Sequence, residues 1–384
     1  MKPSVNTKAA GEEIMALTGL RGAAALLVVL YHYIANSFAS APEFLNNGYI
    51  WVDLFFVLSG FVMGANYAKM FATRWTFSAY FKFLGRRIAR IYPLYIFTVF
   101  IGLVLLFLKL NHPASAPLPI ALISQIFLVQ EWGISTSFDG PAWSISAEWA
   151  AYLLFPGLVY ICVFQRWLVA FLVSLLSVAV IFGLYLFSLH TNLDSTFLHR
   201  PLNVWKPLAG LGVFRCIAEF SLGLVVYRIY KTPEGAAIAS NRWLCGSVTV
   251  LIVALLCVRN LEVPLVLLFP VLVLCLTCKD QPVAKAFSTS LMEWLGKLSY
   301  SIYLFHRLVS IAFLEAINTV MGHFGLRHQQ IVATAFCILL TFVIAYLGYK
   351  YLEVPARRWL RNVFEPNRRG LSKVEGAIAI QESN

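Results

Sequence analysis

Arg21 and His32 are the side chains most costly to bury in the first strongly apolar stretch of the chain, LTGLRGAAALLVVLYHY (residues 17–33). An ionisable group within a membrane helix costs about 2.5 kcal/mol or more on insertion scales, so it usually marks a functional site. Eleven residues make close to three helical turns, which puts both side chains on one face, about 16 Å apart along the axis. The small residues of RGAAA between them would let a second helix or a ligand approach closely.

This spacing predicts a site with two ends. Arg21 would bind an anionic donor at one end, and His32 would act as a general base on an acceptor hydroxyl nearer the other end. A simpler alternative stays open on spacing alone. Arg21 would then extend toward lipid phosphates, and His32 would be an ordinary packing residue.

Three further polar residues within apolar motifs are candidates for the same site. Asp53 in WVDLFFVLSGFVM and Glu148 in WSISAEWAAYLLFP are expected at the level of His32, where a carboxylate would orient the imidazole. His306 lies in LGKLSYSIYLFH, near the middle of a predicted span. We therefore expect two carboxylates and two histidines to converge, the alternative for each carboxylate being a place at the membrane interface.

Basic and aromatic residues supply candidate binding groups for two substrates. Arg86, Arg87 and Arg90 in FKFLGRRIARIYPLY lie three or four residues apart, and arginine forks suit phosphate oxygens. Anchoring to anionic lipid is an equally good reading of these arginines. Tryptophans near the predicted outer face could stack on sugar rings, although a membrane-interface belt is the commoner use of tryptophan. These are Trp51, Trp132, Trp143 and Trp149. The candidate acceptor-binding residues are Trp143, Ser144, Ser146 and Tyr303.

The composition predicts the elements that must position these residues. Of 384 residues, 60% are hydrophobic and 12% are charged, and the mean hydropathy is +0.75. These values are typical of an all-α polytopic membrane protein. About ten spans are expected, with residues 120–132 too short to cross the bilayer. The predicted spans are residues 15–36, 49–68, 92–110, 141–162, 168–188, 212–230, 243–258, 263–278, 296–317 and 330–350.

The distribution of charge predicts how the bundle is oriented. Most of the 30 lysines and arginines fall on the side of the two termini, so both termini are expected in the cytoplasm. Arg215 is among the basic residues that are expected in or near outer loops. This bias also accounts for the net charge of +12 without nucleic acid. The expected organisation is a tail (residues 1–14), a transmembrane bundle (15–350) and a basic cytoplasmic tail (351–384). The seven cysteines predict no metal site.

Five of these stretches together resemble the acyltransferase-3 family of integral-membrane O-acyltransferases. The stretches are LTGLRGAAALLVVLYHY, VDLFFVLSGFVM, RRIARIYPLY, WSISAEWAAYLLFP and LGKLSYSIYLFH, in family order from about residue 14 to about 350. The first is the most specific, because it places an arginine, ten residues and a histidine on the first span. Thr18 stands where many members carry Asp, which leaves a role for an acid there in doubt.

The resemblance implies ten membrane helices in the bacterial inner membrane and an activity. That activity is acyl transfer, commonly of acetyl, from cytoplasmic acyl-CoA to a hydroxyl of an extracytoplasmic saccharide or lipid-linked glycan. It implies that Arg21 and His32 are essential, that Arg87 and Arg90 match the basic motif, and that Glu148 is the acid of the fourth motif. Many members carry a fused periplasmic domain. This chain is expected to lack one, and therefore to act alone or with a separate periplasmic partner.

Two chemistries and a rival function remain open at this level. Acyl-CoA would place its phosphates on Arg21, Arg87 and Arg90, and His32, aided by Asp53 or Glu148, would deprotonate the acceptor. Alternatively, His32 would itself carry the acyl group. A transporter or flippase for a lipid-linked sugar or small solute would also need polar residues within spans, although no internal repeat of the kind seen in many transporters is visible. No bound cofactor is expected.

Overall fold

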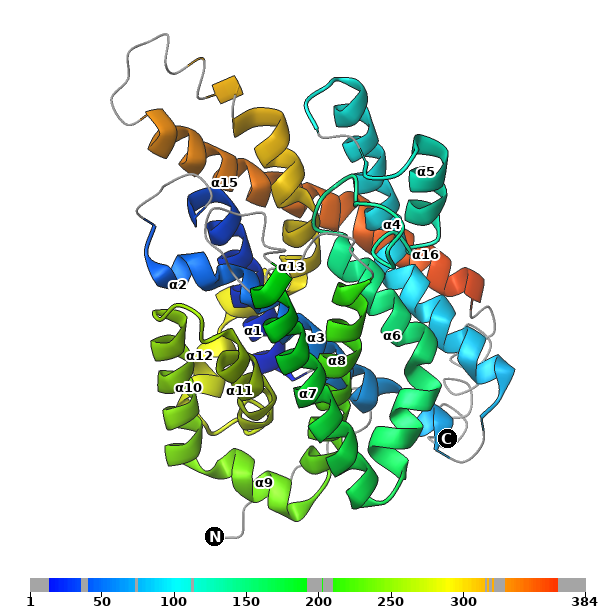
Figure 1. Cartoon of the computed structure of the whole chain (residues 1–384), viewed down its shortest axis with the longest axis vertical. Coiled ribbons are helices and arrows are strands. Elements are labelled where there is room, and N and C mark those ends of the chain that lie inside the picture. The colour runs from blue at the N-terminus through cyan, green and yellow to red at the C-terminus, as the bar shows by residue number, and fades with distance from the viewer. Residues whose placement is uncertain are drawn as a thin grey trace, which may run out of the picture.

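The structure is a computed structural model that describes residues 14–35, 41–72, 75–111, 114–191, 202, 210–314, 316–317, 320 and 329–364. Within these ranges the regular structure is entirely helical (Figure 1). The α-helices are α1 (Met15–Leu30), α2 (Glu43–Asn46), α3 (Trp51–Tyr67), α4 (Phe77–Phe107), α5 (Leu118–Ile126), α6 (Trp143–Val159), α7 (Trp167–Thr191), α8 (Leu211–Tyr230), α9 (Pro233–Ser240), α10 (Arg242–Leu256), α11 (Glu262–Cys275), α12 (Pro282–Phe287), α13 (Ser290–Val309), α15 (Gln329–Gly348) and α16 (Val354–Phe364).

Short helical segments of other types extend several of these helices. Two are 3₁₀ segments, Asn47–Ile50 before α3 and Ala68–Phe71 after it. Four are π-helical. This form is rare in proteins as a whole, but where it occurs it is often at a functional site. The four segments follow α1, α6, α13 and α15, at Tyr31–Ala35, Tyr160–Phe164, Ser310–Leu314 and Tyr349–Glu353.

Six helical runs in the described residues are long and apolar enough to cross a membrane, or seven if the bent pair α9 and α10 forms one span. The protein is therefore a multi-pass membrane protein, with fewer spans by this criterion than the ten expected. The predicted spans over α8 and α13 are long helices that carry charged or other polar side chains, and α11 is a shorter apolar helix. The six runs are Met15–Ala35, Glu43–Phe71, Phe77–Phe107, Trp143–Phe164, Trp167–Thr191 and Gln330–Phe364.

Two helix pairs in the middle of the molecule pack with their backbones in contact. Figure 1 shows α1, α3, α8 and α13 there, with α4, α5, α6 and α16 to one side, α10–α12 to the other and α9 below. A Cβ atom on Gly296 of α13 would lie 2.1 Å from the Thr18 carbonyl oxygen of α1, and one on Gly22 would lie 2.5 Å from the Gly296 nitrogen. The expectation that the small residues after Arg21 admit a second helix is thus confirmed, and that helix is α13.

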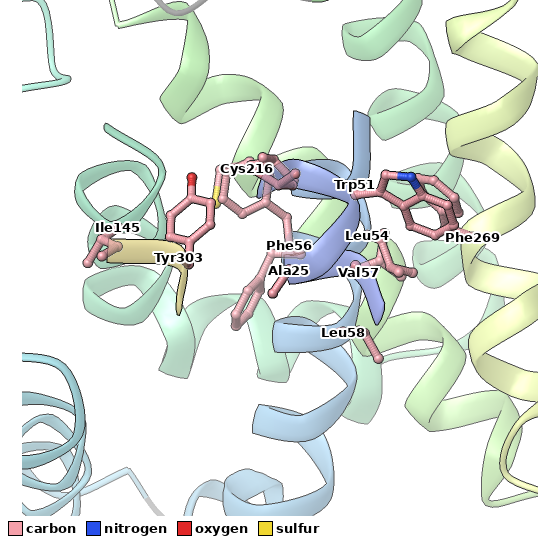
Figure 2. Close-up of a cluster of buried hydrophobic side chains, with 14 of the residues drawn as sticks. Ala25, Trp51, Leu54, Phe56, Val57, Leu58, Ile145, Cys216, Phe269 and Tyr303 are labelled. Atoms are coloured by element: carbon pink, nitrogen blue, oxygen red, sulfur yellow. The ribbon is translucent and has the colours of Figure 1, made fainter. Parts of the chain in front are cut away.

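The second pair, α3 and α8, meets in the same way. A Cβ atom on Gly60 would lie 2.0 Å from the Phe220 carbonyl oxygen, and one on Gly223 would lie 2.1 Å from that of Val57. Small residues at helix crossings are how membrane helices gain packing contacts where lipid removes the hydrophobic driving force. Apolar side chains fill the remaining space, and Figure 2 shows one part of this core around α3.

Candidate functional site

His32 lies where α1 gives way to its π-helical turn. Its Nδ1 atom is 2.9 Å from the carbonyl oxygen of Val28, one turn earlier. A carbonyl oxygen can only accept a hydrogen bond, so Nδ1 carries the proton and Nε2 keeps its lone pair. The backbone of its own helix, rather than a carboxylate, therefore fixes the tautomer of this half-buried imidazole.

His306 of α13 is the ring that faces His32, with the two ring centroids 4.8 Å apart. It is fully buried, and its Nδ1 atom is 2.6 Å from the Tyr303 carbonyl oxygen, so it adopts the same tautomer. Its Nε2 atom is buried without a hydrogen-bond partner among the described residues. Tyr33 secures this region by donating to the His306 carbonyl oxygen at 2.8 Å and contacting the Thr341 hydroxyl at 2.9 Å. The two predicted histidines thus come together.

Tyr303 and Ser144, two of the predicted acceptor-binding residues, also meet beside the histidines. Their hydroxyl oxygens are 2.8 Å apart, and the Tyr303 hydroxyl also lies 3.1 Å from the Pro141 carbonyl oxygen. The centroids of the Tyr303 and His306 rings are 5.8 Å apart. A hydroxyl pair next to two imidazoles is an arrangement that could hold a substrate hydroxyl.

Arg307 adds a positive charge beside the two imidazoles. Its charge acts on both imidazoles, and its stem packs against Gly140, where a Cβ atom would lie 3.0 Å from the Arg307 Cγ. Gly140 has φ +81°, in the region that favours glycine. The signal that could have singled out Arg307 is its position directly after His306 in an apolar motif.

The loop between α5 and α6 lies next to this end of the site and carries two buried acids. Burial raises the pKa of the Glu131 carboxyl to about 8. Burial also raises the pKa of Asp139 to about 7, outweighing the hydrogen bond from the Thr98 hydroxyl. Ser146, a predicted acceptor-binding residue, holds this loop instead. Its hydroxyl donates to the Leu128 carbonyl oxygen at 2.8 Å and accepts from the Glu131 amide at 3.1 Å.

The predicted tryptophans fall in different environments. Trp51 is 6% exposed and stacks on Phe269, with the ring centroids 5.6 Å apart, so it belongs to the core rather than to an acceptor surface (Figure 2). Trp143 is half-buried against Phe56, and Trp149 is also half-buried. Trp132 is 38% exposed and donates from its indole nitrogen to the Ser146 carbonyl oxygen at 3.1 Å.

Glu148 belongs to a second group, around Arg87, rather than to the histidines. The Tyr152 hydroxyl donates to its Oε1 atom at 2.6 Å, and the Ser59 hydroxyl lies 3.3 Å from that of Tyr152. The positive charges of Arg87 and Arg21 both act on the carboxylate. The structure therefore places Glu148 with the predicted donor-binding arginines, whereas the sequence placed it at the level of His32. Tyr152, which the sequence analysis missed, follows Glu148 by one helical turn.

Arg87 is held by aromatic and sulfur groups. Its Nη2 atom donates to the Tyr67 hydroxyl at 3.0 Å, its Nη1 atom lies 3.4 Å from the Met63 sulfur, and the guanidinium is 5.1 Å from the centre of the Tyr67 ring. Arg86 also lies near the Tyr67 ring, 5.8 Å from the ring centre, and its Nη1 atom is 4.0 Å from the Met70 sulfur. Rings and thioethers neutralise no charge, and Glu148 is one acid beside Arg21 and Arg87, so the group keeps a net positive charge.

Arg90, in contrast, is ion-paired. Its Nη1 atom donates to the carboxylate of Glu353, which closes the π-helical turn after α15. The sequence predicts a tail over residues 351–384, whereas α15 continues through the π-helical turn into α16 as far as Phe364.

Asp53 has a different partner from the one the sequence predicted. It is fully buried, and both of its carboxylate oxygens accept hydrogen bonds from Arg215 of α8, with Nε to Oδ1 at 2.6 Å. Glu219 lies on the other side of Arg215, 3.5 Å from Nε. The expectation that Asp53 supports His32 is replaced by this buried pair between α3 and α8. Arg215 itself is 3% exposed within the bundle, not in an outer loop.

No group of three or more His, Cys, Asp or Glu side chains in the described ranges is arranged to hold a metal ion. What the bundle does bring together is a cationic group around Arg21, Arg87 and Glu148, and a pair of imidazoles with unprotonated Nε2 atoms. Internal polar groups of this kind occur in integral-membrane enzymes and in transporters, and the paired imidazoles are a feature that an enzyme working within the bundle would use.

Comparison with known proteins identifies the family. The family model for the acyltransferase-3 domain matches residues 14–350. The chain therefore belongs to the acyltransferase-3 family. Acyltransferase MdmB of Streptomyces mycarofaciens is 30% identical over 319 residues, which cover 76% of this chain and 78% of that protein. No solved structure matches.

Two further relatives have more specific names. Peptidoglycan O-acetyltransferase OatA of Listeria monocytogenes is 23% identical over 384 residues, and O-acetyltransferase OatA of Staphylococcus aureus is 25% identical over 396 residues. Each alignment covers 92% of this chain, but only 57% and 59% of the two relatives. The chain thus spans little more than half the length of these two proteins. The family and these relatives together make the chain a membrane O-acyltransferase.

Proposed function

We propose that the protein transfers an acyl group, acetyl in the simplest case, from acyl-CoA to a hydroxyl of a saccharide or lipid-linked glycan. The proposed setting is a bacterial inner membrane, with the donor entering from the cytoplasm and the acceptor on the other side. The names of two relatives, an O-acetyltransferase and a peptidoglycan O-acetyltransferase, support the acetyl group and the saccharide class.

The cationic group around Arg21 and Arg87 is the proposed donor site. Phosphates need forked, permanently charged donors, and Arg87 contacts rings and a thioether while sharing the Glu148 charge with Arg21, which leaves a net positive charge to attract an anion. Arg90 and Arg86 lie on the same helix, α4, and would contribute to this field. The pantetheine arm would then run along α1 toward His32, whose helix passes both ends of the site.

The observation that carries the proposal is the pair of imidazoles. The Nε2 atom of His32 is unprotonated because Nδ1 donates to Val28, so it can accept the proton of the acceptor hydroxyl. The hydroxyl oxygen then attacks the thioester carbonyl carbon, the carbon–sulfur bond breaks, and the imidazolium returns the proton to the departing thiolate. An acyl-histidine route would need the same unprotonated Nε2. Arg307, whose charge acts on both rings, would stabilise the oxyanion.

The test is transfer from radiolabelled acetyl-CoA to saccharide by the purified protein and by His32→Ala. We expect the variant to lose about 10²-fold or more in turnover, since the base is removed. His190→Ala is the matched control. That exposed histidine also bonds its Nδ1 atom to a carbonyl oxygen one turn earlier, Leu186 at 2.9 Å, but lies at the end of α7. Full transfer by His32→Ala would refute the mechanism. Acyl-CoA-independent movement of a lipid-linked sugar, without transfer, would favour a flippase.

A further inference from the structure

Glu353 is a buried carboxylate that the family match does not reach, because that match ends at residue 350. It is the last residue of the π-helical turn Tyr349–Glu353, which joins α15 to α16, and it is 1% exposed. A charge so deeply buried is stable only if its oxygens are paired.

Three elements supply those partners. Arg90 of α4 donates from Nη1 to the Oε1 atom of Glu353. Ser301 of α13 donates to Oε2 at 2.8 Å. Arg357, one turn along α16, places its Nη1 atom 3.8 Å from Oε1. Glu353 thus links three helices, through ion pairs to α4 and α16 and through a hydrogen bond to α13.

Arg90 still has capacity for a second anion. The hydrogen bond to Glu353 uses Nη1, and a guanidinium carries five N–H donors. The Arg90 side chain is 22% exposed, compared with 1% for Glu353, and it lies over the Tyr300 ring at 5.7 Å. The ring and the carboxylate fix the arginine from two sides while part of its surface stays accessible.

We propose that Glu353 is a positioning residue that holds the Arg90 guanidinium in place for the phosphates of the donor. This rests on the proposed function, in which Arg90 belongs to the donor site. A long arginine side chain loses rotamer freedom when it binds an anion, and a partner that orders it beforehand lowers that cost. The Ser301 contact extends the link to α13, the helix that also carries His306.

The test compares two donors on the same preparation. Acetyl-CoA carries nucleotide phosphates, and S-acetylpantetheine is the same thioester without them. We expect Glu353→Gln to raise the KM for acetyl-CoA about tenfold, a size typical of one charge-assisted hydrogen bond, with kcat within about twofold. The activity with S-acetylpantetheine should not change. The ratio between the two donors does not depend on how much of the variant is folded.

Two further variants sharpen the result. Ser301→Ala removes one hydrogen bond from the carboxylate but keeps its charge, so a smaller rise in KM for acetyl-CoA is expected, about twofold to threefold. Glu293→Gln is the control. It removes an exposed ion pair on α13, in which Lys297 Nζ is 2.6 Å from Glu293 Oε1, and should leave both donors unaffected.

Three outcomes would overturn the proposal. Equal loss with both donors would show a general structural role, unchanged kinetics would show no role, and a lower KM for acetyl-CoA would show that Glu353 competes with the donor. The Arg90→Gln variant separates a failure of the positioning role of Glu353 from a failure of the proposed function. If Arg90→Gln raises the KM for acetyl-CoA and Glu353→Gln does not, the positioning role alone fails. If the wild-type protein uses neither thioester, the proposed function fails.

Discussion

At the scale of single residues, both histidines are oriented by carbonyl oxygens of their own helices. His32 uses Val28 and His306 uses Tyr303, so no carboxylate is needed to select the tautomer. This leaves the buried acids for other tasks. Glu148 balances charge near Arg87 and Arg21, and Asp53 balances Arg215.

Asp53→Asn should therefore affect stability more than catalysis. The change leaves the buried Arg215 charge with Glu219, at 3.5 Å, as its acid partner, and breaking a buried pair costs about 3 kcal/mol or more. We expect a clearly lower unfolding temperature in detergent, measured by tryptophan fluorescence, and acyl transfer per folded molecule within about twofold of wild type. Asp280→Asn, at an exposed acid, should change neither quantity. Lost turnover at unchanged stability would instead place Asp53 in the chemistry.

At the scale of helices, the periodicity of apolar residues predicted much of the bundle. Six predicted spans overlap the six helical runs that can cross a membrane, and RGAAA marked the face of α1 that meets α13. The partners of the buried charges could not be predicted, because Asp53 and Arg215 are 162 residues apart in the chain. Such a pair depends on how α3 packs on α8, which a single sequence does not specify.

The π-helical turns are a second feature beyond reach of the sequence pattern. Helical spacing assumed one continuous α-helix through His32, whereas residues Tyr31–Ala35 form a wider turn. The wider turn departs from the 3.6-residue period from which a shared face for Arg21 and His32 is predicted. The π-helical turn arises from a shift in backbone hydrogen bonding rather than from a distinctive residue type, so the local sequence does not predict it.

Gly296→Ala tests the contact between α1 and α13. The new Cβ atom would lie 2.1 Å from the Thr18 carbonyl oxygen, so the helices must separate. Overpacking of this kind costs about 1–3 kcal/mol, and it should also shift His306 away from His32. We expect a lower unfolding temperature together with lower transfer activity. Gly246→Ala in α10 is the control, because a Cβ atom there meets nothing within 4 Å and alanine favours a helix. Normal activity of Gly296→Ala would show that the helix separation does not control the imidazole pair.

At the scale of the whole molecule, the two ends of the site require an orientation in the membrane. Acyl-CoA is proposed to approach from the cytoplasm, so the arginine group must face that side and the histidine pair must lie deeper. The predicted span over residues 263–278, which covers α11, gives a test of the orientation that is independent of the site. The turn at residues 257–261 precedes α11 and that at residues 276–281 follows it, with a 14-residue helix of about 21 Å between them.

Cys257 makes this orientation measurable, because it is the one exposed cysteine among those described. The positive-inside bias puts Arg259 outside and Lys279 inside. We expect a membrane-impermeant maleimide to label Cys257 in right-side-out vesicles and a cysteine introduced by Asp280→Cys only in inverted vesicles. The background would replace Cys162, Cys216, Cys245, Cys275, Cys278 and Cys337 by serine, and the Asp280→Cys variant would also carry Cys257→Ser. The reverse pattern would place the arginine group on the outer side. Cytoplasmic acyl-CoA could not then reach it, and the donor would have to come from elsewhere.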